Sequence, residues 1–313
     1  MTTPGITVII PTMATRERSS SLLRALAAIR GQEIPCQIIV VVNGSKRDAH
    51  VFAALREADD IELLTLDEGN LVKALAAGVE AVRTKYFSVL DDDDILRTGA
   101  CAKRLQYMEA HPEADALATP GEKQYADGRK EWMPLRFNAN DPLTSLFDYN
   151  WLTPCGGIYR RSRVGPEYFA SMPRYLEWTY LAFRLVRERR GHFCMDDPDP
   201  HFTMFETAGS ESQKLEYFIA MPENILQMQD PTLPRNVQRL LADKFARALH
   251  EAATQSMAWA RITDAWRFHI RCLGHRHGIR FLPFTRHLIR ATFQSSRGPH
   301  GPASAAGDEN AKA

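Results

Sequence analysis

The first part of the chain alternates short apolar runs with segments whose apolar side chains recur at helical spacing. The apolar runs cover residues 6–10, 38–42, 61–66 and 86–90, and the helical segments cover 19–30, 51–58 and 71–82. Strands that are apolar throughout and separated by helices are typical of a parallel sheet buried on both faces. The pattern therefore predicts an α/β fold, a Rossmann-like and mostly parallel central sheet with helices on both faces.

The rest of the chain gives a less regular pattern. A helix is expected at 97–111, an irregular segment up to about 154, a helix at 176–190, a strand at 201–205 and a polar loop at 206–212. Helices at 237–253 and 257–273 follow, and the last residues contain too few apolar side chains to pack. We therefore expect an α/β domain over 1–225, a basic helical extension over 226–293 and a disordered tail over 294–313.

Composition narrows the class of protein. The 44% hydrophobic and 25% charged content is that of an ordinary globular protein, and the net charge of +1 argues against a surface built throughout for nucleic acid. The five cysteines show no C-x-x-C spacing, which argues against a disulfide framework or a zinc site. Neither a secretory signal nor a long apolar stretch is visible, so the expected location is the cytoplasm.

Four consecutive aspartates, Asp91 to Asp94, follow the fourth apolar run. The carboxyl ends of parallel strands meet at one edge of a sheet, so these acids should lie near residues 11–12 and 43–45. In an extended segment Asp91 and Asp93 share a face, and hard carboxylate oxygens suit Mg²⁺ or Mn²⁺, which can hold a diphosphate. The alternative is a solvated acidic turn that favours the start of the next helix.

Four segments, in order, resemble glycosyltransferase family 2. They are Val8-Ile9-Ile10-Pro11-Thr12 with Arg16, then Val40-Val41-Val42-Asn43-Gly44-Ser45, then Leu90 to Asp94, and finally residues 153–162, TPCGGIYRRS. The resemblance covers about residues 5–210. It implies a GT-A fold and inverting transfer of a sugar from a nucleotide-sugar donor with a divalent metal, Mn²⁺ or Mg²⁺.

The resemblance also implies roles for individual residues. Asp91 and Asp93 correspond to the D-x-D aspartates that hold the metal, and His201 is a further candidate ligand. The candidate donor-binding residues are Pro11, Thr12, Arg16, Asn43, Lys73, Asp91 and Asp92, and the acceptor-side candidates are Gly156, Gly157 and Trp178. A structural role is the alternative for His201.

Two segments depart from the family pattern. Asn43 stands where an acidic residue usually approaches the base, and an amide can still donate and accept hydrogen bonds there. Leu75 and Ala76 stand where polar residues are expected. Lys73 could supply the missing positive charge to the diphosphate, and the alternative is a solvated surface lysine.

Direct displacement at an anomeric carbon needs a base for the acceptor hydroxyl. The family places that base in an acidic pair at the start of a late helix, and Glu177, followed by Trp178, resembles this element reduced to a single acid. We therefore predict Glu177 as the catalytic base. The alternative is a glutamate that only stabilises a helix N-terminus.

The C-terminal region has a large excess of basic over acidic residues. Residues 235–297 contain twelve Lys or Arg and three Asp or Glu, with aromatic and aliphatic residues interleaved. Such a segment suits an anionic inner membrane surface, which would make a lipid-linked acceptor plausible beside a polysaccharide one. The alternative is a helical pair that packs on the catalytic domain with a solvated basic face.

Other functions fit less well. A sugar nucleotidyltransferase needs a Gly-rich loop after the first strand, and residues 13–18 contain no glycine. Neither GxxxxGK[ST] nor GxGxxG occurs, which argues against P-loop and Rossmann dehydrogenase sites. A degenerate transferase kept as a binding scaffold remains an alternative. A nucleic-acid partner leaves the aspartates unexplained, so none is expected.

Overall fold

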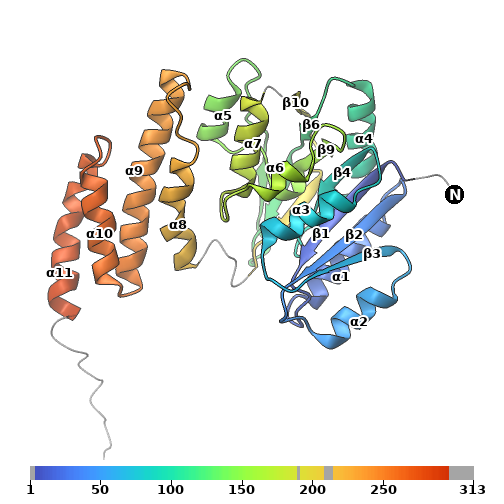
Figure 1. Ribbon diagram of the computed structural model, residues 1–313, viewed down its shortest axis with the longest axis horizontal. Coiled ribbons are helices and arrows are strands. Elements are labelled where there is room, and N and C mark those ends of the chain that lie inside the picture. Colours follow the sequence, from blue (N-terminus) through green and yellow to red (C-terminus); the bar gives the residue numbers. More distant parts are fainter. Residues whose placement is uncertain (1–3, 189–190, 208–213, 296–313) are drawn as a thin grey trace, which may run out of the picture. The chain divides into compact units, whose positions relative to one another are not determined.

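The computed structural model describes residues 4–188, 191–207 and 214–295 (Figure 1). The chain divides into two compact units, Met1–Leu241 and Ala242–Ala313, and each is described by itself. The domain limits expected from the sequence stay a prediction. Gln294 and Ser295, which were assigned to the disordered tail, belong to a helix, and the rest of that tail lies outside the described residues.

The larger unit is built on a central sheet with the strand order β10-β6-β9-β4-β1-β2-β3. β1 is parallel to β2 and β4, β2 is parallel to β3, and β9 runs antiparallel to β4 and β6. The mostly parallel sheet expected from the apolar runs is confirmed. The strands are β1 Ile6–Thr12, β2 Cys36–Asn43, β3 Ile61–Leu66, β4 Tyr86–Val89, β6 Ala116–Ala118, β9 Gly157–Arg160 and β10 His192–Cys194.

Helices cover both faces of this sheet. On one face, Leu22 and Leu26 of α1 (Ser19–Arg30) join the buried cluster that contains Val8. On the other face, α3 (Leu71–Ala81) approaches so closely that a Cβ on Gly78 would lie 2.5 Å from Cγ2 of Ile9. The glycine lets the helix pack directly on β1. The other helices beside the sheet are α2 Ala49–Glu57, α4 Ala100–Ala110 and α6 Pro166–Ala170.

A second sheet replaces much of the irregular segment expected before residue 154. Its order is β5-β11-β7-β8, with β5 Ile95–Leu96, β7 Gly121–Gln124, β8 Lys130–Met133 and β11 Phe202–Phe205. β7 and β8 form a hairpin whose turn contains Gly128 at φ +85°, a conformation that glycine adopts without strain. The prediction was wrong here because the hairpin strands are polar, and only the Asp127-Gly128 pair indicates the turn.

The last part of the larger unit is helical, with α5 Pro142–Asp148, α7 Glu177–Arg187 and α8 Leu215–Leu226. α8, which the sequence pattern did not predict, contacts the residues that precede α7. Nδ2 of Asn224 donates to the carbonyl of Arg174 at 2.6 Å, and the rings of Tyr175 and Tyr217 lie 5.7 Å apart. α8 therefore fixes the approach of the chain to Glu177.

The smaller unit consists of the second part of α9 (Arg235–Ala258), α10 (Ile262–Leu273), a 3-10 turn (Ile279–Phe284) and α11 (Thr285–Ser295). Its core holds Cys272, whose Sγ donates to the carbonyl of Ala246 at 3.3 Å, and His250, whose ring stacks on Phe281 at 4.1 Å. The basic extension is thus a packed helical unit. In the described part of the chain, no helix is long and apolar enough to cross a bilayer.

Candidate active site

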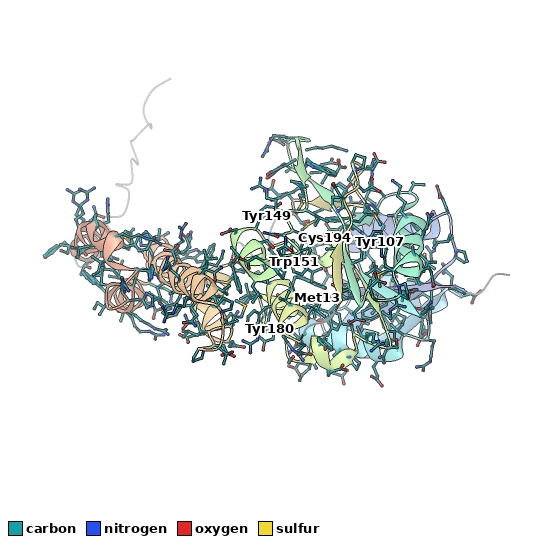
Figure 2. All side chains as sticks on the ribbon, turned by 90° about the horizontal axis from the view of Figure 1, so that it is seen from above. Met13, Tyr107, Tyr149, Trp151, Tyr180 and Cys194 are labelled. Carbon is teal, nitrogen blue, oxygen red and sulfur yellow. The ribbon has the colours of Figure 1, made fainter. Side chains whose placement is uncertain are left out.

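The carboxyl ends of β1 and β2 meet the aspartate segment, as the strand pattern predicts. Oγ1 of Thr12 donates to Oδ2 of Asp92 at 2.6 Å, and Nδ2 of Asn43 donates to the carbonyl of Thr12 at 3.1 Å. Thr12, Asn43 and Asp92 are buried, as is Pro11 within β1. Met13, which follows Thr12 and is labelled in Figure 2, is 41% exposed, so the exposed surface begins one residue after Thr12.

The four aspartates form a turn, because the N–H of Asp94 donates to the carbonyl of Asp91 at 3.2 Å. The turn replaces the extended backbone on which Asp91 and Asp93 would share a face. It brings Asp91 beside Asp94, and ligand atoms of these two and of Cys155 all lie within 4.8 Å of one another. The Sγ of Cys155 donates to Oδ2 of Asp94 at 3.1 Å, and the N–H of Phe205 donates to its Oδ1 at 2.9 Å.

The crowded carboxyl groups favour a cation. Burial raises the pKa of Asp91 well above its usual value, and the charges of Asp94, Asp93, Asp92 and Glu177 raise it further. Burial and the neighbouring Asp93 raise the pKa of Asp94 to about 7. Carboxyl groups held this close resist ionisation unless positive charge joins them. Two hard carboxylates fit a divalent metal ion such as Mg²⁺ or Mn²⁺, and the protonated thiol of Cys155 donates to one of them.

Two arginines of the α1 segment hold the other side of the turn. Arg18 forms an ion pair with Asp92, and its Nη1 lies 3.4 Å from Oδ2 of Asp93. Nη2 of Arg24 donates to the carbonyl of Asp93 at 2.8 Å, and Oγ1 of Thr207 donates to Oδ2 of that residue at 2.8 Å. The sequence reasoning missed Arg18. Its position just before a helix that follows β1 was the available signal.

Glu177 lies at the N-terminus of α7 and is 8% exposed. Its charge raises the pKa of Asp91. Burial raises the pKa of Tyr217 on α8, and the charge of Glu177 raises it further. The charge of Glu177 thus acts on the aspartate cluster from a distant part of the sequence. A buried carboxyl group beside an acidic cluster is the arrangement expected of a general base.

Aromatic side chains surround α5 and α7. Trp178 is half-buried, with its ring centroid 6.5 Å from that of Phe169. Figure 2 labels Tyr149, Trp151 and Tyr180, and Nε1 of Trp151 donates to the carbonyl of Pro142 in α5 at 3.3 Å. Trp178 and Tyr180 are only partly buried, so α7 presents aromatic surface next to Glu177.

Gly156 and Gly157 follow Cys155, and their backbone carbonyls accept hydrogen bonds from neighbouring strands or loops. The carbonyl of Gly156 accepts from the N–H of Thr119 at 2.9 Å, and that of Gly157 accepts from Oγ of Ser88 at 2.8 Å. The fully buried Arg104 donates through Nη2 to the carbonyl of Cys155 at 2.8 Å. The two glycines therefore fix the backbone around Cys155, and their part in acceptor binding stays a prediction.

Two of the candidate donor-binding cations lie on exposed surface. Arg16 is exposed in the segment after β1. Lys73 forms an ion pair with Glu68, and both side chains are 61% exposed. Neither side chain is brought to the aspartates by a hydrogen bond or ion pair within the described residues, so their roles toward the donor remain predictions.

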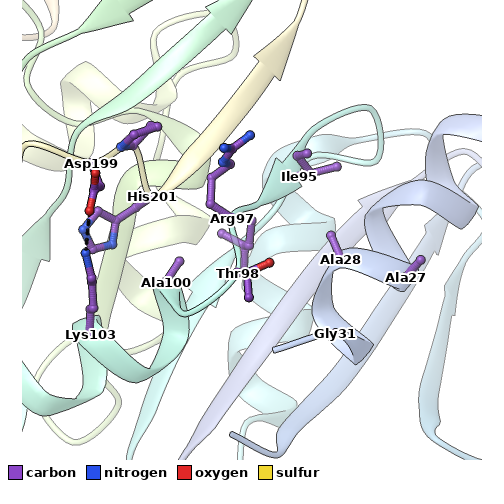
Figure 3. Close-up of a pocket in the computed structure, with 12 residues that line it drawn as sticks. Ala27, Ala28, Gly31, Ile95, Arg97, Thr98, Ala100, Lys103, Asp199 and His201 are labelled. Atoms are coloured by element: carbon purple, nitrogen blue, oxygen red, sulfur yellow. Dashed lines mark hydrogen bonds and ion pairs between the residues drawn. The ribbon is translucent and has the colours of Figure 1, made fainter. Parts of the chain in front are cut away.

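His201 lines a separate surface cavity of about 580 Å³ (Figure 3). Its Nε2 lies 3.2 Å from Oδ2 of Asp197, and burial, with the charge of Arg104, lowers its pKa to about 4. It is not among the clustered ligand atoms of Asp91 and Asp94. Its role as a metal ligand stays a prediction. The cavity is lined by Ala27, Ala28, Gly31, Ile95, Leu96, Arg97, Thr98, Ala100, Lys103, Asp199, Pro200 and His201.

Comparison with known proteins agrees with this architecture. The sequence pattern described as Glycosyl transferase family 2 matches residues 7–165. TarS of S. aureus, solved with UDP-GlcNAc, is similar at a TM-score of 0.57 and 13% identity, covering 84% of this chain and 80% of that one. A mannosyltransferase of Pyrobaculum calidifontis, solved with GDP-Man and Mn²⁺, is similar at a TM-score of 0.54 and 14% identity, covering 95% and 88%. Among curated protein sequences none matches.

Proposed function

Because the chain belongs to glycosyltransferase family 2, we propose that it moves a sugar from a nucleoside-diphosphate sugar to an acceptor hydroxyl with inversion at the anomeric carbon. One observation carries this proposal: ligand atoms of Asp91, Asp94 and Cys155 lie within 4.8 Å of one another where the aspartate segment meets the carboxyl ends of β1 and β2. The buried Glu177 at the start of α7 adds a carboxyl group whose charge acts on Asp91. Inverting displacement needs a base and a diphosphate-binding edge on opposite sides of the anomeric carbon.

The donor nucleotide would bind at the carboxyl ends of β1 and β2. Asn43 donates a hydrogen bond to Thr12, and Thr12 donates one to Asp92, so this edge is fixed before a ligand arrives. Arg18 adds positive charge next to the acids, and Arg16 and Lys73 are further candidates for the diphosphate. A rigid polar edge costs little reorganisation when the nucleotide binds.

Asp91 and Asp94 would hold a divalent metal, Mn²⁺ or Mg²⁺, with Asp93 next to them. The raised pKa values of Asp91 and Asp94 support this, because carboxylates that repel one another gain from a shared cation. When bound, such an ion neutralises charge on the departing diphosphate. His201 stays a secondary candidate ligand.

Glu177 would accept the proton of the acceptor hydroxyl. As the acceptor oxygen forms its bond to the anomeric carbon, the bond from that carbon to the diphosphate oxygen breaks, and the nucleoside diphosphate leaves. Trp178 on the same helix would place an aromatic face against a sugar ring. The acceptor is a glycan or a lipid-linked saccharide, and the site of action is the cytoplasm.

A thermal-shift screen tests the donor and metal parts. UDP, GDP and dTDP, with CMP as control, are added with and without Mn²⁺ or Mg²⁺, and UDP-GlcNAc and GDP-Man follow because similar structures hold them. A metal-dependent rise in melting temperature with one nucleotide, lost in Asp93→Ala and Asp91→Asn, is expected. The absence of any shift would refute the proposal. A shift without turnover on any acceptor would favour the scaffold alternative.

A further inference from the structure

The last described helix, α11, and the 3-10 turn before it present apolar side chains to solvent. Leu282, Ile289 and Phe293 are 55%, 44% and 65% exposed. Ile289 and Phe293 are four residues apart in α11 and therefore share one side of that helix, and Leu282 lies in the 3-10 turn just before it. Leu288, next to Ile289, is fully buried and packs inward, so the exposed side chains point away from the core of their own unit. Single exposed apolar residues are ordinary, but several in one short segment, two of them on the same side of a helix, indicate a contact surface.

Arginines accompany these apolar residues. Arg286 and Arg290 are both exposed and lie on α11, the helix that carries Ile289 and Phe293. Asp264 is the only acid between residues 262 and 295, and it lies 2.5 Å from Arg261. The segment therefore combines exposed apolar side chains with positive charge. We call Leu282, Arg286, Ile289, Arg290 and Phe293 the basic apolar face.

We propose that the basic apolar face binds the surface of an anionic lipid bilayer. Arginines beside an apolar helix stripe can contact lipid phosphates while the apolar side chains enter the boundary between headgroups and acyl chains. The long aliphatic stems of Arg286 and Arg290 allow their guanidinium groups to remain at the headgroups. The proposal does not depend on the donor or on the reaction.

Charge and polarity favour lipid over other occupants. A second copy of this face would bring Arg286 and Arg290 against their own equivalents, which like-charge repulsion opposes. A nucleic acid would use the arginines but leave Ile289 and Phe293 in water. An anionic bilayer satisfies both parts of the face. It also suits an acceptor that is attached to lipid.

Sedimentation of the full chain with vesicles tests the proposal. We expect binding to phosphatidylcholine vesicles that contain phosphatidylglycerol, little binding to pure phosphatidylcholine, and weaker binding as NaCl rises. The double variant Ile289→Asn/Phe293→Asn should bind at least tenfold more weakly, since ~0.8 kcal/mol is lost for each buried CH₂ that is removed. Arg286→Gln and Arg290→Gln should each weaken binding about fivefold, which corresponds to ~1 kcal/mol per arginine.

Matched controls lie in the larger unit. Leu23→Asn removes an apolar side chain that is 60% exposed on α1, and Arg56→Gln removes an exposed arginine on α2. Neither should change vesicle binding. All variants should keep the far-UV spectrum and any nucleotide-dependent thermal shift of the wild type, so failure of the lipid proposal is distinguishable from failure of the donor proposal.

Three results would overturn the proposal. The first is no binding to phosphatidylglycerol vesicles at low salt. The second is equal binding by the wild type and the double variant. The third is a dimer in light scattering, or a complex with RNA, that the double variant loses while vesicle binding is unchanged, because the face would then have a different occupant.

Discussion

The acidic turn of the larger unit and the basic apolar face of the smaller unit are both concentrations of like charge, but the first is buried and the second is exposed. Asp92 and Asp94 are almost completely buried, and each is held by hydrogen bonds from other parts of the chain. Arg286 and Arg290 project from one helix into solvent. The acids are fixed in position, whereas the arginines are arranged along a surface.

This difference separates two uses of charge. Buried like charges oppose folding, so they persist where a bound cation or a reaction needs them. Exposed charges cost little stability and act through the potential that they create outside the protein. Changes at the acidic turn should therefore alter binding and turnover of the donor, and changes at the basic apolar face should alter only where the enzyme binds.

The largest effect is expected from Glu177→Gln. The amide cannot accept the acceptor proton, so we expect kcat to fall about 10³-fold, within the range of general-base catalysis. Donor binding measured by calorimetry should stay within about twofold, because the contacts of the donor edge are unchanged. Glu216→Gln, in the first turn of α8, is the matched control and should keep full activity. A Glu177→Gln enzyme with more than a tenth of the wild-type kcat would exclude Glu177 as the base.

Asp91→Asn should have opposite effects with and without metal. In the metal-free protein it removes a buried carboxyl group that its neighbours repel, so the melting temperature should rise, by roughly 1 kcal/mol in stability. With Mn²⁺ at a hundred times its Kd, the wild type should gain ~2.7 kcal/mol that the variant lacks. Thermal unfolding with EDTA or Mn²⁺ measures both effects.

Asp60→Asn is the control for that experiment, because Asp60 pairs with Arg30 on exposed surface. It should change the free energy of unfolding by no more than about 0.5 kcal/mol, both with EDTA and with Mn²⁺. Equal stabilisation of the wild type and Asp91→Asn by Mn²⁺ would place the metal elsewhere. The acidic turn would then be a buried charge cluster that binds no metal, and the proposed functional difference between it and the basic apolar face would no longer hold.

The central fold was predictable because its signal is local. Continuous apolar runs and helical spacing gave β1 to β4 and α1 to α3 with ends accurate to a few residues. The meeting of Thr12, Asn43 and Asp92 followed from the rule that parallel strands share a carboxyl edge. The turn residues Asp127 and Gly128 were also local signals, but the polar strands around them hid the hairpin.

The finer geometry of the site depends on distant parts of the chain. The pairing of Asp91 with Asp94 follows from a turn held by Cys155 and Phe205, residues far away in sequence. α8 was missed because it contains Pro222, a residue that usually ends a helix. Its role is to contact the residues that precede Glu177. No spacing rule on the aspartates alone could reveal these contacts. The pattern gave Thr12, Asn43, the aspartate segment and Glu177 as candidates, whereas the contacts of Arg18 and Cys155 with the aspartates came only from the structure.

His201 offers a test of intermediate size. Burial lowers its pKa to about 4, below the ordinary value of 6.5, so the unfolded chain binds a proton first as the pH falls. The stability from His201 is full above pH 6.5 and is lost towards pH 4, by ~1.4 kcal/mol per pH unit. Denaturant unfolding between pH 6.5 and 5 should show a steeper loss for the wild type than for His201→Gln. Parallel curves would show that the imidazole is hydrated in the folded protein.

The smallest effect is expected from Arg290→Gln, and Arg18→Gln is its counterpart in the larger unit. Removing Arg18 leaves the buried Asp92 without its cation, which should cost ~1–2 kcal/mol after allowance for the partial exposure of the arginine. Removing the exposed Arg290 should change stability by less than ~0.5 kcal/mol. Thermal unfolding of both variants makes the comparison. If Arg290→Gln destabilises the protein as much as Arg18→Gln, the arginines of the basic apolar face hold the helical unit together, and their arrangement is then explained by folding and not by a lipid surface.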